Sequence, residues 1–180
     1  MIFSLILFFI FVIMTENMKN YDIVYGKKEF FDPTNWLKSS GIYKGPLKNG
    51  NAHGIGEVNW ESGSRYFGEF KNDYLNGYGT MLFKNKDVYI GQWVEDMMQG
   101  HGHYMYENGD QYIGEWFEDR MHGHGKYIYE NGDEYIGEWV DSQIQGHGKM
   151  TYKDGTTYIG EFEDHNYTPY SRKRRKLLLQ

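Results

Sequence analysis

Aromatic residues recur at alternate positions in short stretches along most of the chain. The stretch YIGEW, which begins at Tyr112 and again at Tyr135, is typical of them. Successive side chains of a β-strand point to opposite faces, so Tyr112, Gly114 and Trp116 are predicted to share one face of a strand. A glycine between two large rings weakens a strand, because it has no side chain to pack. Its position therefore requires a structural reason.

The same pattern recurs every 23 residues without insertion. In each repeat a tyrosine is followed two positions later by glycine and four positions later by a large apolar residue. The sets are Tyr43, Gly45 and Leu47; Tyr66, Gly68 and Phe70; Tyr89, Gly91 and Trp93; Tyr112, Gly114 and Trp116; Tyr135, Gly137 and Trp139; and Tyr158, Gly160 and Phe162. A Gly-x-Gly pair, an aromatic residue and a turn follow the first five sets. Residues 43–168 are therefore predicted to be five full structural repeats and one half repeat.

Each repeat is predicted to form a β-hairpin. Its first strand runs for about six residues from the tyrosine, a short polar loop such as residues 95–99 follows, and the second strand starts at the Gly-x-Gly pair. Asn108-Gly109 and the equivalent dipeptides predict a type I′ turn, which needs a left-handed conformation at both central residues. Successive hairpins without a crossover helix give an antiparallel meander.

The repeated glycines are predicted to make room for aromatic rings. If the two strands of a hairpin pair with Gly114 and Gly125 on one face, the glycines leave hollows for rings of the neighbouring strand. One repeat buries too little apolar surface to offset its backbone entropy, so the repeats are expected to stack as in a solenoid.

The segment before the repeats, residues 19–42, is predicted to cover the first repeat. It contains the signals of a short helical turn, with Asp32 as the N-cap, Pro33 as the first helical residue and Gly41 as the end.

The first 18 residues form an apolar leader. Residues 1–14 are apolar except for Ser4, and a helix of this length spans about 21 Å, less than the ~30 Å hydrocarbon core of a bilayer. Three interpretations stay open. The leader is a signal or short membrane anchor, it is absent because translation starts at Met14 or Met18, or it packs against the repeats. A retained leader would associate the protein with a membrane.

The net charge of −6 is unevenly distributed. Residues 43–166 carry 21 acidic and 10 basic side chains, so they are expected to repel nucleic acid and anionic membranes. The tail, residues 169–180, has no acid and carries five bases, Arg172, Lys173, Arg174, Arg175 and Lys176. The tail is interpreted as a solvated segment, as a nuclear-import signal or contact with an acidic partner, or as a contact with an anionic membrane.

No pattern in the chain is typical of an enzyme. There is no Cys, and the Gly-x-Gly pairs lack the Gly-Lys-Ser/Thr of a nucleotide loop. His101, His124 and His147 form a column, but equivalent positions in successive hairpins are about 10 Å apart, too far to share one metal ion. We therefore expect no catalytic residue, no cofactor and no metal.

The face opposite the rings carries a repeated pair of an apolar and a polar residue. The pairs are Ile90 and Gln92, Ile113 and Glu115, and Ile136 and Glu138. One interpretation is a solvated face that keeps the sheet soluble. The alternative is a binding strip for a protein partner with a basic amphipathic segment. The end of the half repeat is a further candidate surface, because an open strand edge allows antiparallel pairing into a homodimer.

The pattern Tyr-x-Gly-x-Trp, Gly-x-Gly, aromatic and Asn-Gly, at 23 residues per repeat, resembles the MORN repeat (membrane occupation and recognition nexus). The resemblance covers about 125 of the 180 residues, with departures at Leu47 and Lys86. It implies an all-β fold, an elongated, twisted, single-layer antiparallel meander of successive β-hairpins with short irregular or helical ends.

The resemblance also implies a function. MORN arrays occur in proteins that bridge membranes, in cytoskeletal and ciliary scaffolds, and beside separate lipid-kinase or histone methyltransferase domains. We expect a non-catalytic scaffold or adaptor for protein–protein interaction, in the cytoplasm or on the cytoskeleton. The alternatives are membrane or phospholipid recruitment through the leader or the tail, and an accessory subunit of an enzyme on another chain.

Overall fold

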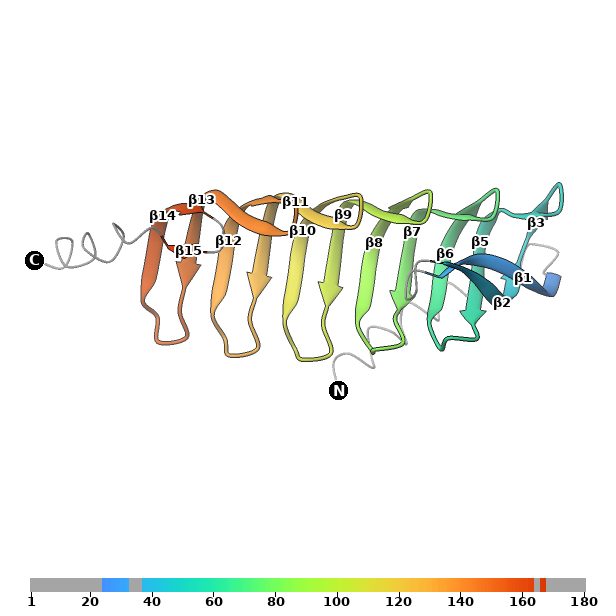
Figure 1. Ribbon diagram of the computed structural model, residues 1–180, viewed down its shortest axis with the longest axis horizontal. Helices are drawn as coiled ribbons and strands as arrows, with labels where there is room; N and C mark the ends of the chain where they lie inside the picture. The colour runs from blue at the N-terminus through green and yellow to red at the C-terminus, as the bar shows by residue number, and fades with distance from the viewer. Residues whose placement is uncertain (1–23, 33–36, 164–165, 168–180) are drawn as a thin grey trace, which may run out of the picture. The chain divides into compact units, whose positions relative to one another are not determined.

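The computed structural model describes residues 24–32, 37–163 and 166–167 (Figure 1). These residues form strands and short turns, and no helix occurs within the described ranges. They divide into two compact bodies, each described here by itself.

The N-terminal body comprises the described residues up to Lys84 together with Val94–Asp96. Its main sheet has the strand order β1-β2-β5-β6-β7, and β3 and β4 form a separate pair. The strands are β1 (Val24–Asp32), β2 (Leu37–Gly45), β3 (Leu47–Lys48), β4 (Asn51–Ala52), β5 (Gly54–Trp60), β6 (Arg65–Lys71) and β7 (Tyr74–Leu82). The neighbouring strands of this body pair antiparallel.

The C-terminal body comprises Asn85–Trp93 and the described residues from Met97 onward. Its strands are hydrogen-bonded in chain order, from β8 to β15. They are β8 (Val88–Val94), β9 (Met97–Met105), β10 (Gln111–Phe117), β11 (Arg120–Ile128), β12 (Glu134–Val140), β13 (Gln143–Thr151), β14 (Thr157–Glu163) and β15 (Asn166–Tyr167). The predicted all-β meander of hairpins is confirmed.

The first hairpin corrects the prediction of a helical turn near Asp32. Residues from Leu37 to Gly45 are strand β2, and they pair with β1 over its whole length. The Asp32 carboxylate is buried and accepts a hydrogen bond from the Ser39 hydroxyl at 3.2 Å, so this carboxylate serves the hairpin. The predicted helical end from Leu37 to Gly41 is therefore wrong, because these residues belong to the nine-residue ladder with β1, and residues 33–36 of the predicted turn lie outside the described residues.

The loop inside each hairpin is shorter than predicted. The predicted loop 95–99 is wrong, because Met97 already begins β9 and only Glu95 and Asp96 connect the strands. Both have left-handed φ values, 49° and 70°, as a type I′ turn requires. The equivalent turns behave alike, with positive φ at both residues of Asn72-Asp73, Glu118-Asp119 and Asp141-Ser142.

The turn after each hairpin also differs from the prediction. Left-handed φ falls on Gly109, at 100°, and not on Asn108. The Gly109 amide donates to the Tyr106 carbonyl, and the Tyr106 amide donates to the Asp110 carbonyl, each at 3.0 Å. This is a three-residue loop, a type I turn closed by a glycine bulge, so the predicted type I′ turn at Asn-Gly is wrong.

Rings from consecutive repeats build the core. Tyr112 is fully buried and contacts Trp116 of its own repeat and Trp139 of the next, both with centroids 5.2 Å apart and steep interplanar angles. Tyr135 contacts Trp139 and Phe162 in the same way. Such edge-to-face pairs are the favoured aromatic geometry. Because each tyrosine packs on two repeats, the expectation that stacked repeats supply the core is confirmed.

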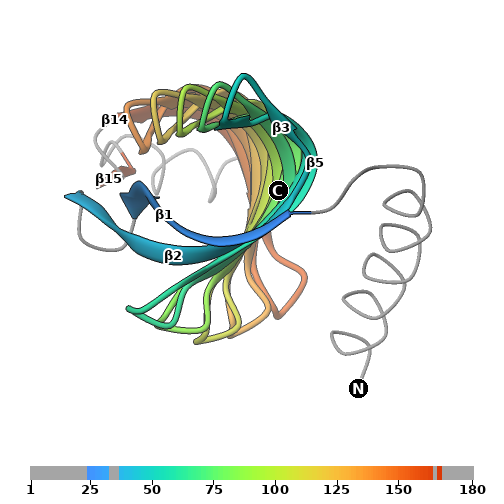
Figure 2. The same ribbon diagram turned by 90° about the vertical axis from the view of Figure 1, so that its right-hand side faces the viewer.

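The first hairpin brings an extra ring to the N-terminal body. Figure 2 shows β1 and β2 crossing the open side of the bent strands of this body. Phe30 of β1 is buried and contacts Tyr43 and Phe70, with centroids 5.6 and 5.7 Å apart. The described part of the segment 19–42 therefore packs on the first repeat, as a strand hairpin.

Candidate interaction surface

Each repeat holds its tyrosine ring against a pair of glycines. Gly114 of β10 pairs with Gly125 of β11, and the Tyr112 ring lies over both. A methyl group at Gly114 would lie 2.6 Å from Tyr112 Oη, and one at Gly125 would lie 2.6 Å from Tyr112 Cζ. The Tyr112 hydroxyl donates a hydrogen bond to the Glu115 carbonyl at 2.9 Å. The glycines make room for a ring as predicted, but this ring belongs to β10 and covers a glycine of its own strand too.

The same arrangement recurs in the other repeats. The hydroxyls of Tyr66, Tyr89 and Tyr135 each donate to the carbonyl three residues later. Within each repeat the predicted structural residues share one face, here called the ring face: Tyr66, Gly68 and Phe70; Tyr89, Gly91 and Trp93; Tyr112, Gly114 and Trp116; and Tyr135, Gly137 and Trp139. Burial raises the pKa of Tyr135 to about 12, so its phenol stays protonated and serves packing.

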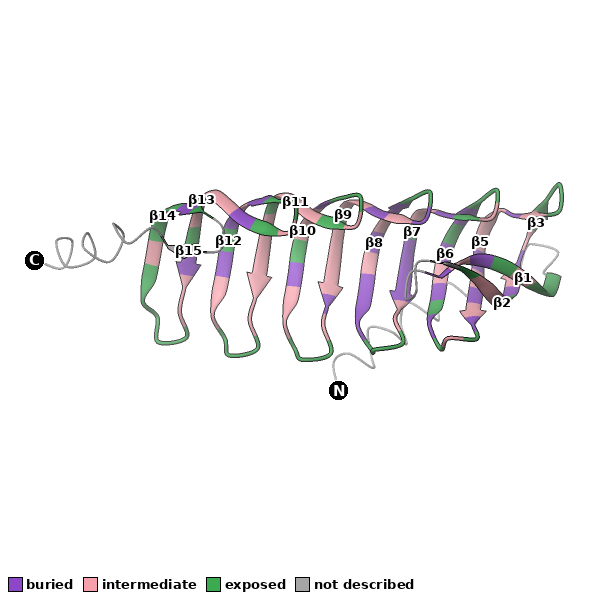
Figure 3. Ribbon diagram, viewed as in Figure 1, coloured by how far each residue is buried: buried purple, intermediate pink, exposed green. Residues whose placement is uncertain are grey.

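The face of the C-terminal body opposite the packed rings is called the isoleucine face. The first strand of each hairpin contributes one isoleucine to it: Ile90, Ile113, Ile136 and Ile159. The exposed fraction rises along the chain, from half-buried at Ile90 to 44% at Ile113, 51% at Ile136 and 74% at Ile159. Less exposed positions separate the exposed ones along β10, β12 and β14 (Figure 3). These strands therefore present apolar side chains to solvent in a regular line.

The glutamates of this face accept hydrogen bonds from backbone amides of the neighbouring strand. The register of β10 with β11 shifts after Gly114, and Gly123 and His124 have no partner on β10. The Glu115 Oε1 atom accepts a hydrogen bond from the His124 amide at 2.9 Å, next to Gly123 with its left-handed φ of 59°. The carboxylate thus accepts a hydrogen bond from an amide that has no backbone partner on β10, because the ladder is irregular there.

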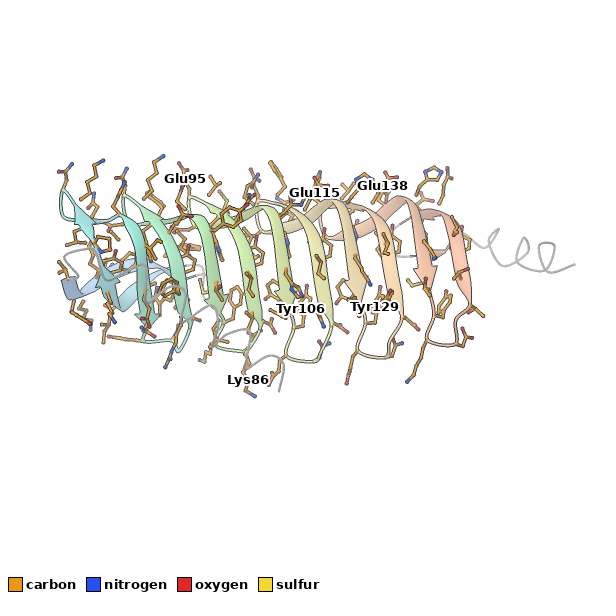
Figure 4. All side chains as sticks on the ribbon, turned by 180° about the vertical axis from the view of Figure 1, so that it is seen from behind. Lys86, Glu95, Tyr106, Glu115, Tyr129 and Glu138 are labelled. Atoms are coloured by element: carbon orange, nitrogen blue, oxygen red, sulfur yellow. The ribbon has the colours of Figure 1, made fainter. Side chains whose placement is uncertain are left out.

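This bond repeats along the body. Glu138 accepts from the His147 amide at 2.9 Å, and Gln92 accepts from the His101 amide at 3.2 Å. Glu115 and Glu138 lie at equivalent positions near one end of the strands, and Tyr106 and Tyr129 lie nearer the other end (Figure 4). The side chains of Glu115 and Glu138 are still 44% exposed. The sequence analysis missed this bond, although each Glu precedes the first glycine of the Gly-x-Gly pair by eight residues.

The second strands add basic residues to the isoleucine face. Lys126 pairs with both Ile113 and Ile136, and Lys149 pairs with both Ile136 and Ile159, so one row alternates isoleucine and lysine. Lys126 Nζ lies 2.9 Å from Glu134 Oε1. The predicted alternation of apolar and acidic residues holds along each first strand, but lysines separate the isoleucines across the sheet.

A neighbouring row alternates histidine and glutamate. His147 Nδ1 lies 4.0 Å from Glu138 Oε1, and its Nε2 lies 3.6 Å from Glu161 Oε1. His124 Nδ1 lies 3.9 Å from Glu115 Oε1. The histidine rings are well exposed, and these pairs become ionic only when histidine is protonated. Within the described ranges, no three His, Asp or Glu side chains are grouped so that they could hold a metal ion.

Protein-family models were compared with the chain. The model described as MORN repeat matches five consecutive segments, residues 43–65, 66–88, 89–111, 112–134 and 135–157. The chain belongs to the MORN repeat family. Each matched segment begins at the tyrosine that covers the glycine pair, and the resemblance drawn from the sequence is confirmed. No match was found among curated proteins.

The MORN repeats are joined by aspartates at their two-residue turns. The Asp119 amide donates to the Met98 carbonyl at 3.1 Å, and the Asp119 carboxylate accepts from the Met98 amide at 2.7 Å. The equivalent pairs are Asp73 with Ala52, Asp96 with Leu75, and Ser142 with Met121. The sequence analysis missed these clamps, although their spacing of 23 residues would have indicated them. The pKa of Asp119 lies above its usual value, because burial raises it and the charge of Glu118 raises it further. The hydrogen bond from the Met98 amide lowers the pKa but does not outweigh burial.

A second set of aspartates joins the glycine-bulge turns of the MORN repeats. Asp110 accepts from the Glu130 amide at 2.7 Å and from the Tyr127 hydroxyl at 3.0 Å. Asp87 has the same two kinds of partner, the Glu107 amide and the Tyr104 hydroxyl. Burial alone would raise the pKa of Asp110. Its hydrogen bonds from the Glu130 amide, Asn108 and Tyr127 outweigh burial, so the pKa lies below its usual value.

Two candidate sites predicted from the sequence cannot be placed. The apolar leader and the basic tail, Arg172, Lys173, Arg174, Arg175 and Lys176, lie outside the described residues. Among the residues that the structure does describe, no helix has the length and apolar character needed to cross a membrane.

Proposed function

We propose that the protein is a non-catalytic MORN scaffold that binds a protein partner on the isoleucine face. The observation that carries this proposal is the line of exposed Ile113, Ile136 and Ile159 beside half-exposed carboxylates. Exposed apolar side chains gathered on one face are typical of interaction surfaces, and here lysines stand between successive isoleucines of the row. On the ring face of the same strands, Tyr112, Tyr135, Trp116 and Trp139 are buried against one another.

The partner is expected to carry a basic amphipathic segment. The described residues of the C-terminal body have 14 acidic and five basic side chains, a net charge of −9. Such a charge speeds association with a basic partner and disfavours acidic ones. Apolar side chains of the segment would contact the isoleucines, and its cations would lie over Glu115, Glu138 and Glu161.

The test uses two synthetic amphipathic helices, one of leucine and lysine and one of leucine and glutamate, and the full-length chain. Fluorescence anisotropy should detect salt-sensitive binding of the lysine peptide only. The combined change Glu115→Gln and Glu138→Gln should weaken binding about two- to thirtyfold, since each of the two exposed ion pairs contributes about 0.2–1 kcal/mol. Glutamine keeps the structural hydrogen bond, as Gln92 does in the preceding repeat, so the fold should be retained.

A second pair of variants tests the apolar part of the surface. Ile113→Ser with Ile136→Ser should weaken peptide binding, and the control Ile42→Ser, at an exposed site in the N-terminal body, should not. Equal binding of both peptides, or equal behaviour of the two sets of variants, would contradict the proposal.

The strand β14 supports a second candidate function, self-association. It pairs with β13 from Thr157 to Phe162, but with β15 only at Phe162 and Glu163, so much of one edge has no partner strand among the described residues. Tyr158 of β14 is also less buried than Tyr135. Unpaired edges pair readily with a second copy, in an antiparallel and two-fold symmetric way. Light scattering of the full-length chain should then show a dimer, and a monomer at every concentration would exclude it.

A further inference from the structure

We propose that the tail, residues 169–180, docks on the isoleucine face of its own chain. This inference rests on the proposed function, because it names an intramolecular competitor for the same surface. The tail has the chemistry that this surface selects. Five consecutive basic residues, from Arg172 to Lys176, are followed by three leucines, and no acid accompanies them.

The charges of the two parts are complementary. The C-terminal body carries a net charge of −9 in its described residues, and the tail carries five positive charges. The half-exposed carboxylates of Glu115 and Glu138 and the well-exposed carboxylate of Glu161 form a row next to the isoleucines. In the docked state the cations of the tail lie over this row of carboxylates, and the leucines of the tail lie over the isoleucines. Lys126 of the isoleucine row opposes this weakly, since it is paired with Glu134, and Lys149 adds one further positive charge to the row.

The last described strand before the tail lies next to this surface. The tail follows β15, which pairs with β14, the strand that carries Ile159 and Glu161. Crossing from Ile159 to Ile113 takes four strand steps, about 19 Å at ~4.8 Å per strand. The ten residues from Thr168 to Leu177 span up to about 33 Å when extended. The leucines can therefore reach Ile136 and Ile113 without any change in the sheet.

Tethering makes weak contacts sufficient. A segment joined to its site by a short flexible linker acts at an effective concentration in the millimolar range. A few leucine contacts and screened ion pairs then suffice for the tail to occupy the isoleucine face for much of the time. An external partner has to displace the tail, so docking of the tail sets a threshold for partner binding.

The test is zero-length carbodiimide crosslinking of the full-length chain at low concentration. Equal amounts of unlabelled and ¹⁵N-labelled protein are mixed, so that mass spectrometry separates crosslinks within one copy from those between copies. Crosslinks from Lys173 or Lys176 to Glu115, Glu138 or Glu161 within one copy are expected, and 1 M salt should reduce them because it shortens the screening length to about 3 Å.

A tail variant removes the apolar half of the contact. Leu177→Ser, Leu178→Ser and Leu179→Ser together should lower the yield of these crosslinks about tenfold, because the tail keeps its charges but loses its apolar anchor. The same variant should bind the leucine–lysine peptide more tightly than the unmodified chain does. The control Ile42→Ser should change neither measurement.

Each alternative occupant gives a different result. Crosslinks between differently labelled copies would replace the intramolecular tail with a second copy. Tail-dependent pelleting with phosphatidylserine vesicles, without crosslinks to the isoleucine face, would assign the tail to a membrane. Peptide binding that the leucine changes leave unaltered, with no intramolecular crosslinks, would overturn tail docking and leave the proposed function standing.

Discussion

Lys86 adopts the left-handed backbone conformation that Gly109 adopts 23 positions later. Their φ values are 73° and 100°, and both residues stand at the bulge position of the turn that follows a hairpin. A side chain at this φ crowds the backbone, so glycine is the ordinary choice there. The departure from the repeat pattern at Lys86 is therefore a site of local strain.

Replacing Lys86 with glycine should stabilise the protein. The change relieves the strain of a left-handed lysine, partly offset by the greater freedom that glycine gives the unfolded chain. Calorimetry should show the midpoint of thermal unfolding rising by about 2–4 °C. The change also removes the ion pair of Lys86 with Glu107, which is well exposed. The control Glu107→Gln removes this pair alone and should leave the midpoint nearly unchanged. A fall in stability for Lys86→Gly would show that the turn does not prefer glycine.

Replacing Gly125 with alanine should destabilise the C-terminal body. The new methyl group would lie within van der Waals overlap of the buried Tyr112 ring, which has no space to move. Overpacking of this kind costs about 1–3 kcal/mol, measurable by denaturant unfolding. Gly26 is the matched control, because nothing lies within 4 Å of a methyl group there. If Gly125→Ala were as mild as Gly26→Ala, the ring would not lie over the glycines.

The repeat, the meander and the faces of the strands could be predicted from the sequence for one reason. Side-chain size at alternate positions reports directly on which face is packed, and the 23-residue period confirms each assignment several times over. The glycine pair at Gly114 and Gly125 could be predicted in the same way, since a gap in a packed face has to be filled.

The 23-residue spacing marks the positions of the aspartate clamps, but the turn types and the bond partners could not be predicted, because they depend on register. Asn108-Gly109 suits a two-residue turn as well as a glycine bulge, and only the strand pairing decides between them. The bond from the His124 amide to Glu115 arises from an irregularity in the ladder, and the eight-residue spacing from Glu115 to Gly123 does not by itself specify that irregularity. Phe30 lies outside the repeats, so no period indicates its position in the core.

The clamp at Asp119 should tolerate serine better than alanine. Serine occupies the equivalent position 142, where its hydroxyl accepts the Met121 amide at 3.1 Å. Alanine would leave the Met98 amide without its side-chain acceptor, at a cost of about 1–3 kcal/mol. Denaturant unfolding of the two variants tests this order. Equal losses in both variants would show that the left-handed turn, and not the carboxylate, determines the cost.

Asp110 and Asp119 should contribute to stability with opposite pH dependence. The pKa of Asp110 is lowered in the fold, so its contribution is present above its unfolded pKa and is lost as the pH falls through the folded pKa. The pKa of Asp119 is raised by burial, so its contribution is present in acid and is lost as the pH rises through the folded pKa. The free energy of unfolding of each variant, Asp110→Asn and Asp119→Asn, is subtracted from that of the unmodified chain at each pH from acid to neutral. Plotted against pH, this difference should rise for Asp110→Asn and fall for Asp119→Asn. Slopes of the same sign would contradict the assigned environments.

Phe30 should matter more than any other described side chain of β1. It contacts Tyr43 and Phe70, whereas Leu47, at the ring position of the first repeat, is exposed. Phe30 thus supplies from β1 the ring that the first repeat lacks. Phe30→Ala removes a buried ring at a cost of about 3–5 kcal/mol.

Hydrogen exchange can localise this loss. Repeats contact mainly their neighbours, so amides of β1, β2 and β5 should exchange faster in Phe30→Ala while those of β10 to β12 stay protected. Tyr25→Ala is the control, because Tyr25 lies on β1 but is exposed. Uniform loss of protection in both bodies would mean that the first hairpin stabilises the whole array and not only its first repeat.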